Sequence, residues 1–143
     1  MPDQTGRLRK LDEFQDRNYI VIYFYPMDNT PGCTIEAKGF TKHLDEFHKH
    51  GVEVIGVSTQ SPSSHVNFCS RHDLKIILLS DEEKRLTKQL GVLNGLTRTA
   101  KRTTFLIQPN GRIVKEWRNV KPAIHVQEVL DYIQSLEPPA AAT

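Results

Sequence analysis

The stretch that decides the fold is "YIVIYFYPMDNTPGCTIEAKGF", residues 19–40. Residues 19–25 are continuously apolar and rich in β-branched and aromatic side chains, which predicts a central strand buried on both faces. The apolar run stops at Pro26, and a lone cysteine, Cys33, follows where a helical pattern begins. The stretch therefore predicts a strand, a tight loop and a helix that carries a cysteine at its start.

The rest of the chain alternates in the same way between strand-like and helix-like segments. This order, β-α-β-α-β-α-β-β-α, predicts an α/β domain of thioredoxin-like fold, with a central mixed sheet flanked by helices and an antiparallel hairpin at one side. The predicted strands are 19–25, 52–59, 75–81 and two within 102–118 around "PNG", and the predicted helices are 33–51, 62–72, 82–92 and 125–136.

Length and charge narrow the class of protein. The 143 residues suit one domain, residues 1–137, followed by a tail, 138–143, that we expect to be disordered. The net charge is +2 and the charges are scattered, so we expect no nucleic-acid partner. No apolar run reaches the length of a membrane span, and the N-terminus lacks the apolar core of a signal peptide. We expect a cytoplasmic protein with no membrane partner.

The two cysteines, Cys33 and Cys69, are too few for a disulfide scaffold. No C-x-x-C motif is present, so neither a thioredoxin-type dithiol nor a zinc ribbon is predicted. The six histidines have no regular metal-ligand spacing, and we interpret them as solvated helix-surface residues; we expect no metal and no cofactor. The cysteines are then either inert core thiols or chemically active ones.

Cys33 has the sequence context of a nucleophile. The reactive species is the thiolate, and a helix N-terminus with a nearby cation favours that anion. Pro31 fixes one backbone dihedral, Gly32 allows close approach of the backbone, and Thr30 offers a hydroxyl that can donate or accept a hydrogen bond. The alternative is that residues 30–32 form a simple turn and Cys33 is a core residue at a helix start.

The spacing Pro26-x-x-x-Thr30-x-x-Cys33 resembles the active-site signature of the peroxiredoxins, the thiol peroxidases. The longer string "VIYFYPMDNTPGCTIEAKGF" is similar to their Q-type branch, also called bacterioferritin comigratory proteins. "GVEVIGVSTQSPSSHVNF", "LLSDEEKRLTKQLGV", "RTTFLIQPNGRIVKEW" and "VKPAIHVQEVL" look like matching segments in the same order. The resemblance extends over residues 3–136, except that the stretch 93–101 is shorter than usual and most members carry an extra N-terminal segment.

The resemblance implies a role for each matching residue. Cys33 would be the peroxidatic cysteine, whose thiolate attacks a peroxide oxygen and becomes a sulfenic acid. Thr30 would hold the peroxide, Pro26 would shield the pocket, and Arg102 would complete the site by donating hydrogen bonds to the thiolate and the substrate. Either Glu36 orients Arg102 or its charge favours the helix N-terminus. We interpret Arg98 and Lys101 as solvated loop charges.

Cys69 matches the resolving cysteine that some Q-type members carry in the helix 62–72. The more frequent position, five residues after the first cysteine, is occupied here by Lys38. A disulfide with Cys33 would require local unwinding of both helices, because the bond needs Cα atoms within about 7 Å. The alternative is that Cys69 is a core residue, with Val66 on the same helical face.

We therefore expect a monomeric, thioredoxin-dependent peroxidase that reduces hydrogen peroxide and alkyl hydroperoxides. One alternative is a one-cysteine peroxidase in which Cys69 is structural. Another is a redox sensor or holdase that is oxidised without turnover, and a third is a thioredoxin-type disulfide oxidoreductase, against which the missing C-x-x-C argues.

Overall fold

The computed structural model describes residues 1–10, 13, 19–109 and 111–136. The described strands form a five-stranded mixed sheet in the order β3-β2-β1-β4-β5. The strands are β1 (Tyr19–Phe24), β2 (Val52–Ser58), β3 (Ile77–Ser80), β4 (Thr103–Ile107) and β5 (Ile113–Arg118). The helices are α2 (Pro31–Lys42), α3 (Leu44–Lys49), α4 (Pro62–His72), α5 (Arg85–Gln89) and α6 (Pro122–Ser135). The predicted α/β order is confirmed, and the tail 138–143 lies outside the described residues.

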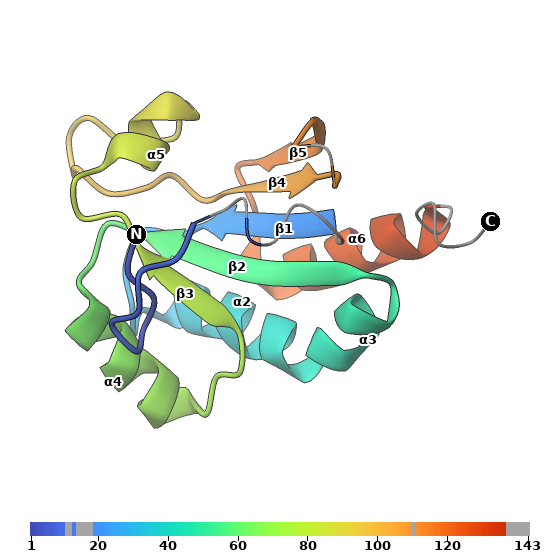
Figure 1. The fold of residues 1–143 in the computed structure, drawn as a ribbon, viewed down its shortest axis with the longest axis horizontal. Coiled ribbons are helices and arrows are strands. Elements are labelled where there is room, and N and C mark those ends of the chain that lie inside the picture. Colours follow the sequence, from blue (N-terminus) through green and yellow to red (C-terminus); the bar gives the residue numbers. More distant parts are fainter. Residues whose placement is uncertain (11–12, 14–18, 110, 137–143) are drawn as a thin grey trace.

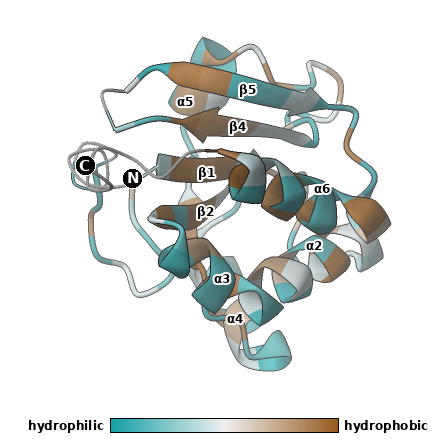
Figure 2. Ribbon diagram, turned by 90° about the vertical axis from the view of Figure 1, so that its right-hand side faces the viewer, coloured by the Kyte–Doolittle hydropathy of each residue, from teal (hydrophilic) through white to brown (hydrophobic). Residues whose placement is uncertain are grey.

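The sheet is covered on both faces (Figures 1 and 2). β1, β2 and β3 run parallel, so the crossovers α2 and α4 lie on one face together with α6, while α5 lies on the other. Each face of the sheet has its own hydrophobic core, and alternate residues of β1 pack into one or the other. Val21 and Tyr23 belong to the core on the face of α2, α4 and α6, and Ile20 and Ile22 belong to the core on the opposite face. β1 is therefore buried on both faces, as its continuously apolar sequence predicts.

The prediction of one continuous helix over residues 33–51 is wrong in two respects, because the segment contains a break and the helix starts earlier. Two helices replace it, since α2 begins two residues earlier and ends before His43, where the chain turns into α3. Gly39 and Thr41 in the last turn of α2 are weak helix formers. Gly39 also sits against α6, where a Cβ would lie 2.9 Å from Val126. The glycine that weakens the helix thus permits close packing of the two helices.

Smaller differences occur at other ends. The third strand is shorter than predicted, Ile77–Ser80. The third predicted helix, 82–92, is also shorter: it begins only at Arg85, because Lys84 has a positive φ of 63° and the buried Asp81 carboxylate accepts hydrogen bonds from Thr87. α6 begins earlier than predicted, at Pro122, a residue suited to the first helical position. The N-terminal residues bridge to the sheet, with Asp3 opposite Leu79 of β3.

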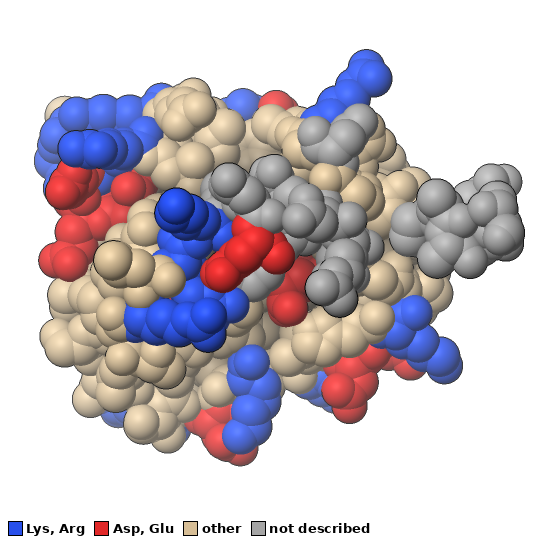
Figure 3. Space-filling view, viewed as in Figure 1, with Lys and Arg blue, Asp and Glu red and all other residues tan. Residues whose placement is uncertain are grey.

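Basic and acidic side chains are interspersed on the face seen in Figure 3. None of the helices in the described part of the chain combines the length and hydrophobicity that a membrane span needs.

Candidate active site

Cys33 lies in the first turn of α2, directly beyond the carboxyl end of β1. α2 begins at Pro31 after the extended residue Thr30, so the N–H groups of its first turn lack intrahelical partners. The Cys33 side chain is fully buried and its thiol is free. The strand, loop and helix start predicted from the sequence thus place a cysteine at a position that favours an anion.

Arg102 reaches Cys33 from a different part of the chain. β4 pairs antiparallel with β1, with Thr103 opposite Phe24, so the residue before β4 lies beside the end of β1. From there, Nη1 of Arg102 donates to Sγ of Cys33 at 3.5 Å. The pairing of two strands far apart in sequence therefore brings the predicted arginine to the predicted cysteine.

Glu36 of α2 forms an ion pair with this arginine. Its Oε1 accepts from Nη1 of Arg102 at 2.6 Å, and the Glu36 side chain is fully buried. Burial raises the pKa of Glu36 to about 7, although the Arg102 charge acts in the opposite direction. Of the two interpretations of Glu36, the contact supports the orienting one. Because α2 starts at Pro31, Glu36 lies beyond the first turn, where the helix dipole has little effect.

The cationic form of Arg102 is favoured by its neighbours. Burial lowers its pKa, but Cys33 and Glu36 outweigh burial, and the pKa lies above its ordinary value. The second oxygen of Glu36 and the hydroxyl of Tyr23 are buried without hydrogen-bond partners among the described residues. Burial, followed by the charges of Glu36 and Cys33, raises the pKa of Tyr23 well above its ordinary value. The site thus has one fixed cation surrounded by groups that are neutral or anionic.

Gly32 lies close to the Arg102 guanidinium. A Cβ at this position would lie 3.0 Å from Nη2 of Arg102 and 3.2 Å from Cγ of Pro122. The close approach predicted for Gly32 therefore involves the guanidinium and the start of α6.

Thr30 and Pro26 lie in the loop between β1 and α2. The Thr30 hydroxyl donates to the carbonyl of Met27 at 2.8 Å, and the Thr30 carbonyl accepts from the Thr34 hydroxyl at 2.7 Å. Because its hydrogen is used within the loop, the Thr30 oxygen keeps its acceptor capacity for another donor. Pro26 is half-buried directly after Tyr25, the last residue of the apolar run.

Cys69 lies in α4, half-buried against the same core that contains Cys33, and its thiol is also free. Burial, with a smaller effect of the Asp28 charge, raises the pKa of the Cys69 thiol to about 11. Cys69 is thus a neutral thiol in the folded protein near pH 7. Val66, used to argue that this helical face is core, is 47% exposed, so that part of the argument was wrong.

The histidines were only partly predicted. His65 and His125 are fully buried, not solvated, and both make polar contacts. His65 lies 2.7 Å from Asp28, and His125 lies 2.7 Å from the Thr104 hydroxyl. A histidine on the apolar side of an amphipathic helix is the signal that could have identified them. Arg98 and Lys101 are exposed, as expected.

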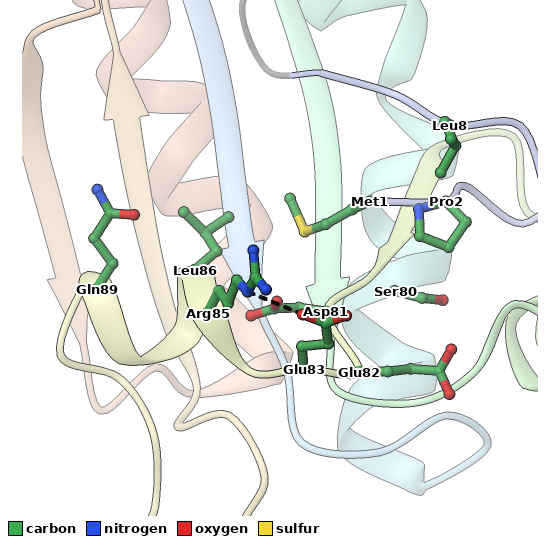
Figure 4. Close-up of a pocket in the computed structure, with 10 residues that line it drawn as sticks. All are labelled: Met1, Pro2, Leu8, Ser80, Asp81, Glu82, Glu83, Arg85, Leu86 and Gln89. Atoms are coloured by element: carbon green, nitrogen blue, oxygen red, sulfur yellow. Dashed lines mark ion pairs between the residues drawn. The ribbon is translucent and has the colours of Figure 1, made fainter.

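A separate cleft of about 450 Å³ lies between the N-terminal residues and the turn into α5 (Figure 4). Met1, Pro2 and Leu8 line one side, and an ion pair between Arg85 and Glu83 lies at the other. None of the predicted site residues lines this cleft.

The fold and site define a class: a thioredoxin-like domain with a buried cysteine at a helix start and an arginine at its sulfur. Residues 1–116 match the model of the AhpC/TSA family. "Peroxiredoxin Bcp" of Xanthomonas campestris is 41% identical over 119 residues, covering 79% of this chain and 74% of the relative. "Peroxiredoxin Bcp" of Bacillus subtilis is 39% identical over 137 residues, covering 92% and 87%.

The solved structures agree. The crystal structure of peroxidoxin BcpB from Mycobacterium tuberculosis superposes with a TM-score of 0.89 at 30% identity, covering 96% of this chain and 92% of that one. The Xanthomonas campestris bacterioferritin comigratory protein, studied for alkyl peroxide reduction, superposes with a TM-score of 0.87 at 34% identity, covering 94% and 88%. The chain belongs to the AhpC/TSA family, and within it to the peroxiredoxins of the Bcp/Q type. It is a peroxidase.

Proposed function

We propose that Cys33 is the peroxidatic cysteine and that Thr30, Pro26 and Arg102 are its catalytic partners. The contact of Arg102 Nη1 with Cys33 Sγ at 3.5 Å carries this proposal. The cation and the helix start favour the thiolate, which attacks a hydroperoxide oxygen; the O–O bond breaks, and water or an alcohol leaves after taking up a proton. Cys33 becomes a sulfenic acid.

The substrates proposed are hydrogen peroxide and alkyl hydroperoxides. Alkyl peroxide reduction is the activity named for the Xanthomonas campestris relative. Arg102 and the acceptor oxygen of Thr30 suit the two ends of a small hydroperoxide group, since one donates and the other accepts.

Cys69 is the proposed resolving cysteine. Two solved structures of Xanthomonas campestris peroxiredoxin Q, each 35% identical to this chain, are cysteine-to-serine variants at positions 36 residues apart. Cys33 and Cys69 have the same separation. The Cys69 thiol would attack the sulfenic sulfur and release water. The resulting intramolecular disulfide would be reduced by thioredoxin through thiol–disulfide exchange.

A one-cysteine peroxidase is the second candidate, favoured by the half-burial of Cys69 and by the raised pKa of its thiol, about 11. In that case an external thiol reduces Cys33 directly. We also propose, from the sequence, that the protein is monomeric and cytoplasmic.

The test is peroxide consumption with thioredoxin as donor, in wild type, Cys33→Ser and Cys69→Ser. We expect no turnover in Cys33→Ser. In Cys69→Ser we expect a strong loss of thioredoxin-dependent turnover, while Cys33 is still oxidised once by peroxide. Full turnover in Cys69→Ser would identify the one-cysteine enzyme. Rapid Cys33 oxidation without turnover under any reductant would instead identify a sensor.

A further inference from the structure

A buried polar cluster lies between the Cys33 loop and α4. Its centre is the Asp28 carboxylate, whose Oδ1 accepts from the Tyr25 hydroxyl at 2.6 Å and whose Oδ2 accepts from the Ser64 hydroxyl at 2.7 Å. Nδ1 of His65 lies 2.7 Å from the same Oδ2. The side chains of Asp28 and His65 are 1% and 0% exposed. The established peroxidase chemistry gives this cluster no role.

The cluster joins the two cysteine-bearing segments. Asp28 lies in the loop that leads into Cys33, and its backbone N–H donates to the Gln60 side chain, just before α4. His65 lies four residues before Cys69, so both occupy the same face of α4. Nε2 of His65 lies 3.1 Å from the carbonyl of Leu79 and so also anchors α4 to β3.

Separating Asp28 from His65 carries a high free-energy cost. Burial raises the pKa of Asp28, but hydrogen bonds from His65, Tyr25 and Ser64 outweigh it, and the pKa lies below its ordinary value. The carboxylate is therefore an ionised group inside the protein. A buried charge that loses a partner destabilises the state in which this happens. α4 is thus held against the Cys33 loop by an interaction that opening must break.

Opening is required if Cys69 resolves Cys33. The Cys33 sulfur faces Arg102, before β4 on one side of β1, whereas α4 precedes β3 on the other side. A disulfide needs Cα atoms within about 7 Å and the two sulfur atoms in contact. Both thiols are free in this structure and the Cys33 sulfur is held at Arg102, so we take disulfide formation to involve movement of both segments. Until they move, a second hydroperoxide can oxidise the sulfenic acid to a sulfinic acid, which the second cysteine no longer reduces.

We infer that Asp28 and His65 form a latch that keeps α4 folded against the Cys33 loop and thereby limits the rate of Cys33–Cys69 disulfide formation. This inference rests on the proposed resolving role of Cys69. The two residues are positioning residues, because they act through the place of α4 and not on the reacting atoms. The latch also sets the balance between resolution and overoxidation of Cys33.

Two substitutions of His65 separate the contacts of its two ring nitrogens, which are Nδ1 with Asp28 and Tyr25 and Nε2 with Leu79 and Ser58. In His65→Asn the side-chain amide occupies the place of Nδ1 and can still donate to Asp28. In His65→Gln the amide occupies the place of Nε2, near Leu79, and leaves Asp28 without this donor. Ser64→Ala removes a hydroxyl donor from the same carboxylate and gives a milder second variant. Asp81→Asn is the matched control, since Asp81 is a buried carboxylate that binds Thr87 instead.

The measurements are disulfide formation after one equivalent of hydrogen peroxide, by acid quench and intact mass, and amide hydrogen exchange of α4 in the reduced protein. His65→Gln should increase both rates roughly tenfold, the effect of losing a hydrogen bond to a charged group, and yield less sulfinic acid under excess peroxide. Ser64→Ala should change both in the same direction by less. His65→Asn and Asp81→Asn should stay near wild type.

Equal α4 exchange and equal disulfide rates in wild type, His65→Gln and Ser64→Ala would overturn the latch while leaving the resolving role of Cys69 intact. Absence of any Cys33–Cys69 disulfide in the wild type would overturn the resolving role, and the function of the latch with it.

Discussion

Nη1 of Arg102 lies 3.5 Å from Sγ of Cys33, and the same nitrogen donates to Glu36 at 2.6 Å. One guanidinium nitrogen is therefore shared between a buried carboxylate and the sulfur of the proposed nucleophile. The carboxylate fixes where the positive charge lies, and that position is beside the Cys33 sulfur.

Replacing Arg102 by Lys should slow the reaction of Cys33 with hydrogen peroxide by about a hundredfold, as loss of one preorganised donor at a reacting centre does. Lysine keeps the charge but loses the planar fork that can contact Glu36 and Cys33 together. The measurement is stopped-flow peroxide consumption by the reduced protein. Arg98→Lys, an exposed arginine of the preceding loop, is the control and should react like wild type. A wild-type rate in Arg102→Lys would refute the role of the fork.

Gly32→Ala should impair the reaction more than the fold. The added Cβ would meet Nη2 of Arg102 at 3.0 Å, and this atom is the mobile end of a long side chain. The arginine can therefore move away, at the expense of its contact with Cys33, and we expect a loss in rate of roughly tenfold with less than about 1 kcal/mol change in unfolding free energy.

Gly95→Ala is the comparison for this substitution, because no heavy atom beyond its chain neighbours lies within 4 Å of the added Cβ. Peroxide consumption and urea unfolding should both match wild type in Gly95→Ala. If Gly32→Ala kept the full peroxide rate, the close packing at Gly32 would have no bearing on the site.

Glu36→Gln should change how stability depends on pH. The pKa of Glu36 is about 7 in the folded protein against an ordinary 4.5, so the folded state binds more protons between these values. The stabilisation is complete below pH 4.5 and is lost as the pH rises through about 7. Relative to wild type, Glu36→Gln should gain up to about 3 kcal/mol between pH 4.5 and 8, by urea unfolding. A constant difference across this range would contradict the burial argument.

His125 should make the unfolding free energy depend on pH in the opposite direction, and His125→Gln should remove this dependence. Burial, followed by the Arg102 charge, lowers the pKa of His125 to about 4 from an ordinary 6.5. The unfolded chain then binds more protons between these values, so this contribution is present above pH 6.5 and is lost as the pH falls towards 4. The glutamine amide can keep the bond to Thr104. Urea unfolding should show that His125→Gln loses less stability than wild type from pH 7 to 4; parallel curves would exclude His125 as the cause.

The fold could be predicted because its central strands are apolar runs in the sequence that end at recognisable residues. β1 ends before Pro26, as predicted. α4 begins at Pro62 with Ser61 as its N-cap, also as predicted. The break at His43 could not be predicted from periodicity, because the apolar pattern continues across it. The break follows the turn in which Gly39 packs against Val126, a contact between segments far apart in sequence.

The proximity of Cys33 and Arg102 could be predicted from the sequence, but the buried groups around them could not. Cys33 and Arg102 were identified from spacing and family resemblance, and the structure brings them together. The buried pair of Asp28 and His65 was missed, because a carboxylate in a polar loop and a histidine on a helix each have an ordinary solvated interpretation. Only the tertiary arrangement removes both from water, since α4 packs against Tyr25 and the loop after β1.

The central claim is that the hydroperoxide oxidises the sulfur of Cys33 directly and does not oxidise Cys69. Cys69→Ser protein, mixed with one equivalent of hydrogen peroxide and a sulfenic-acid probe, should carry the label on the peptide that contains Cys33, as located by mass spectrometry. Cys33→Ser should carry no label and leave the peroxide unconsumed. Peroxide consumption by Cys33→Ser at the wild-type rate, or labelling of Cys69 in wild type while Cys33 stays reduced, would contradict the account.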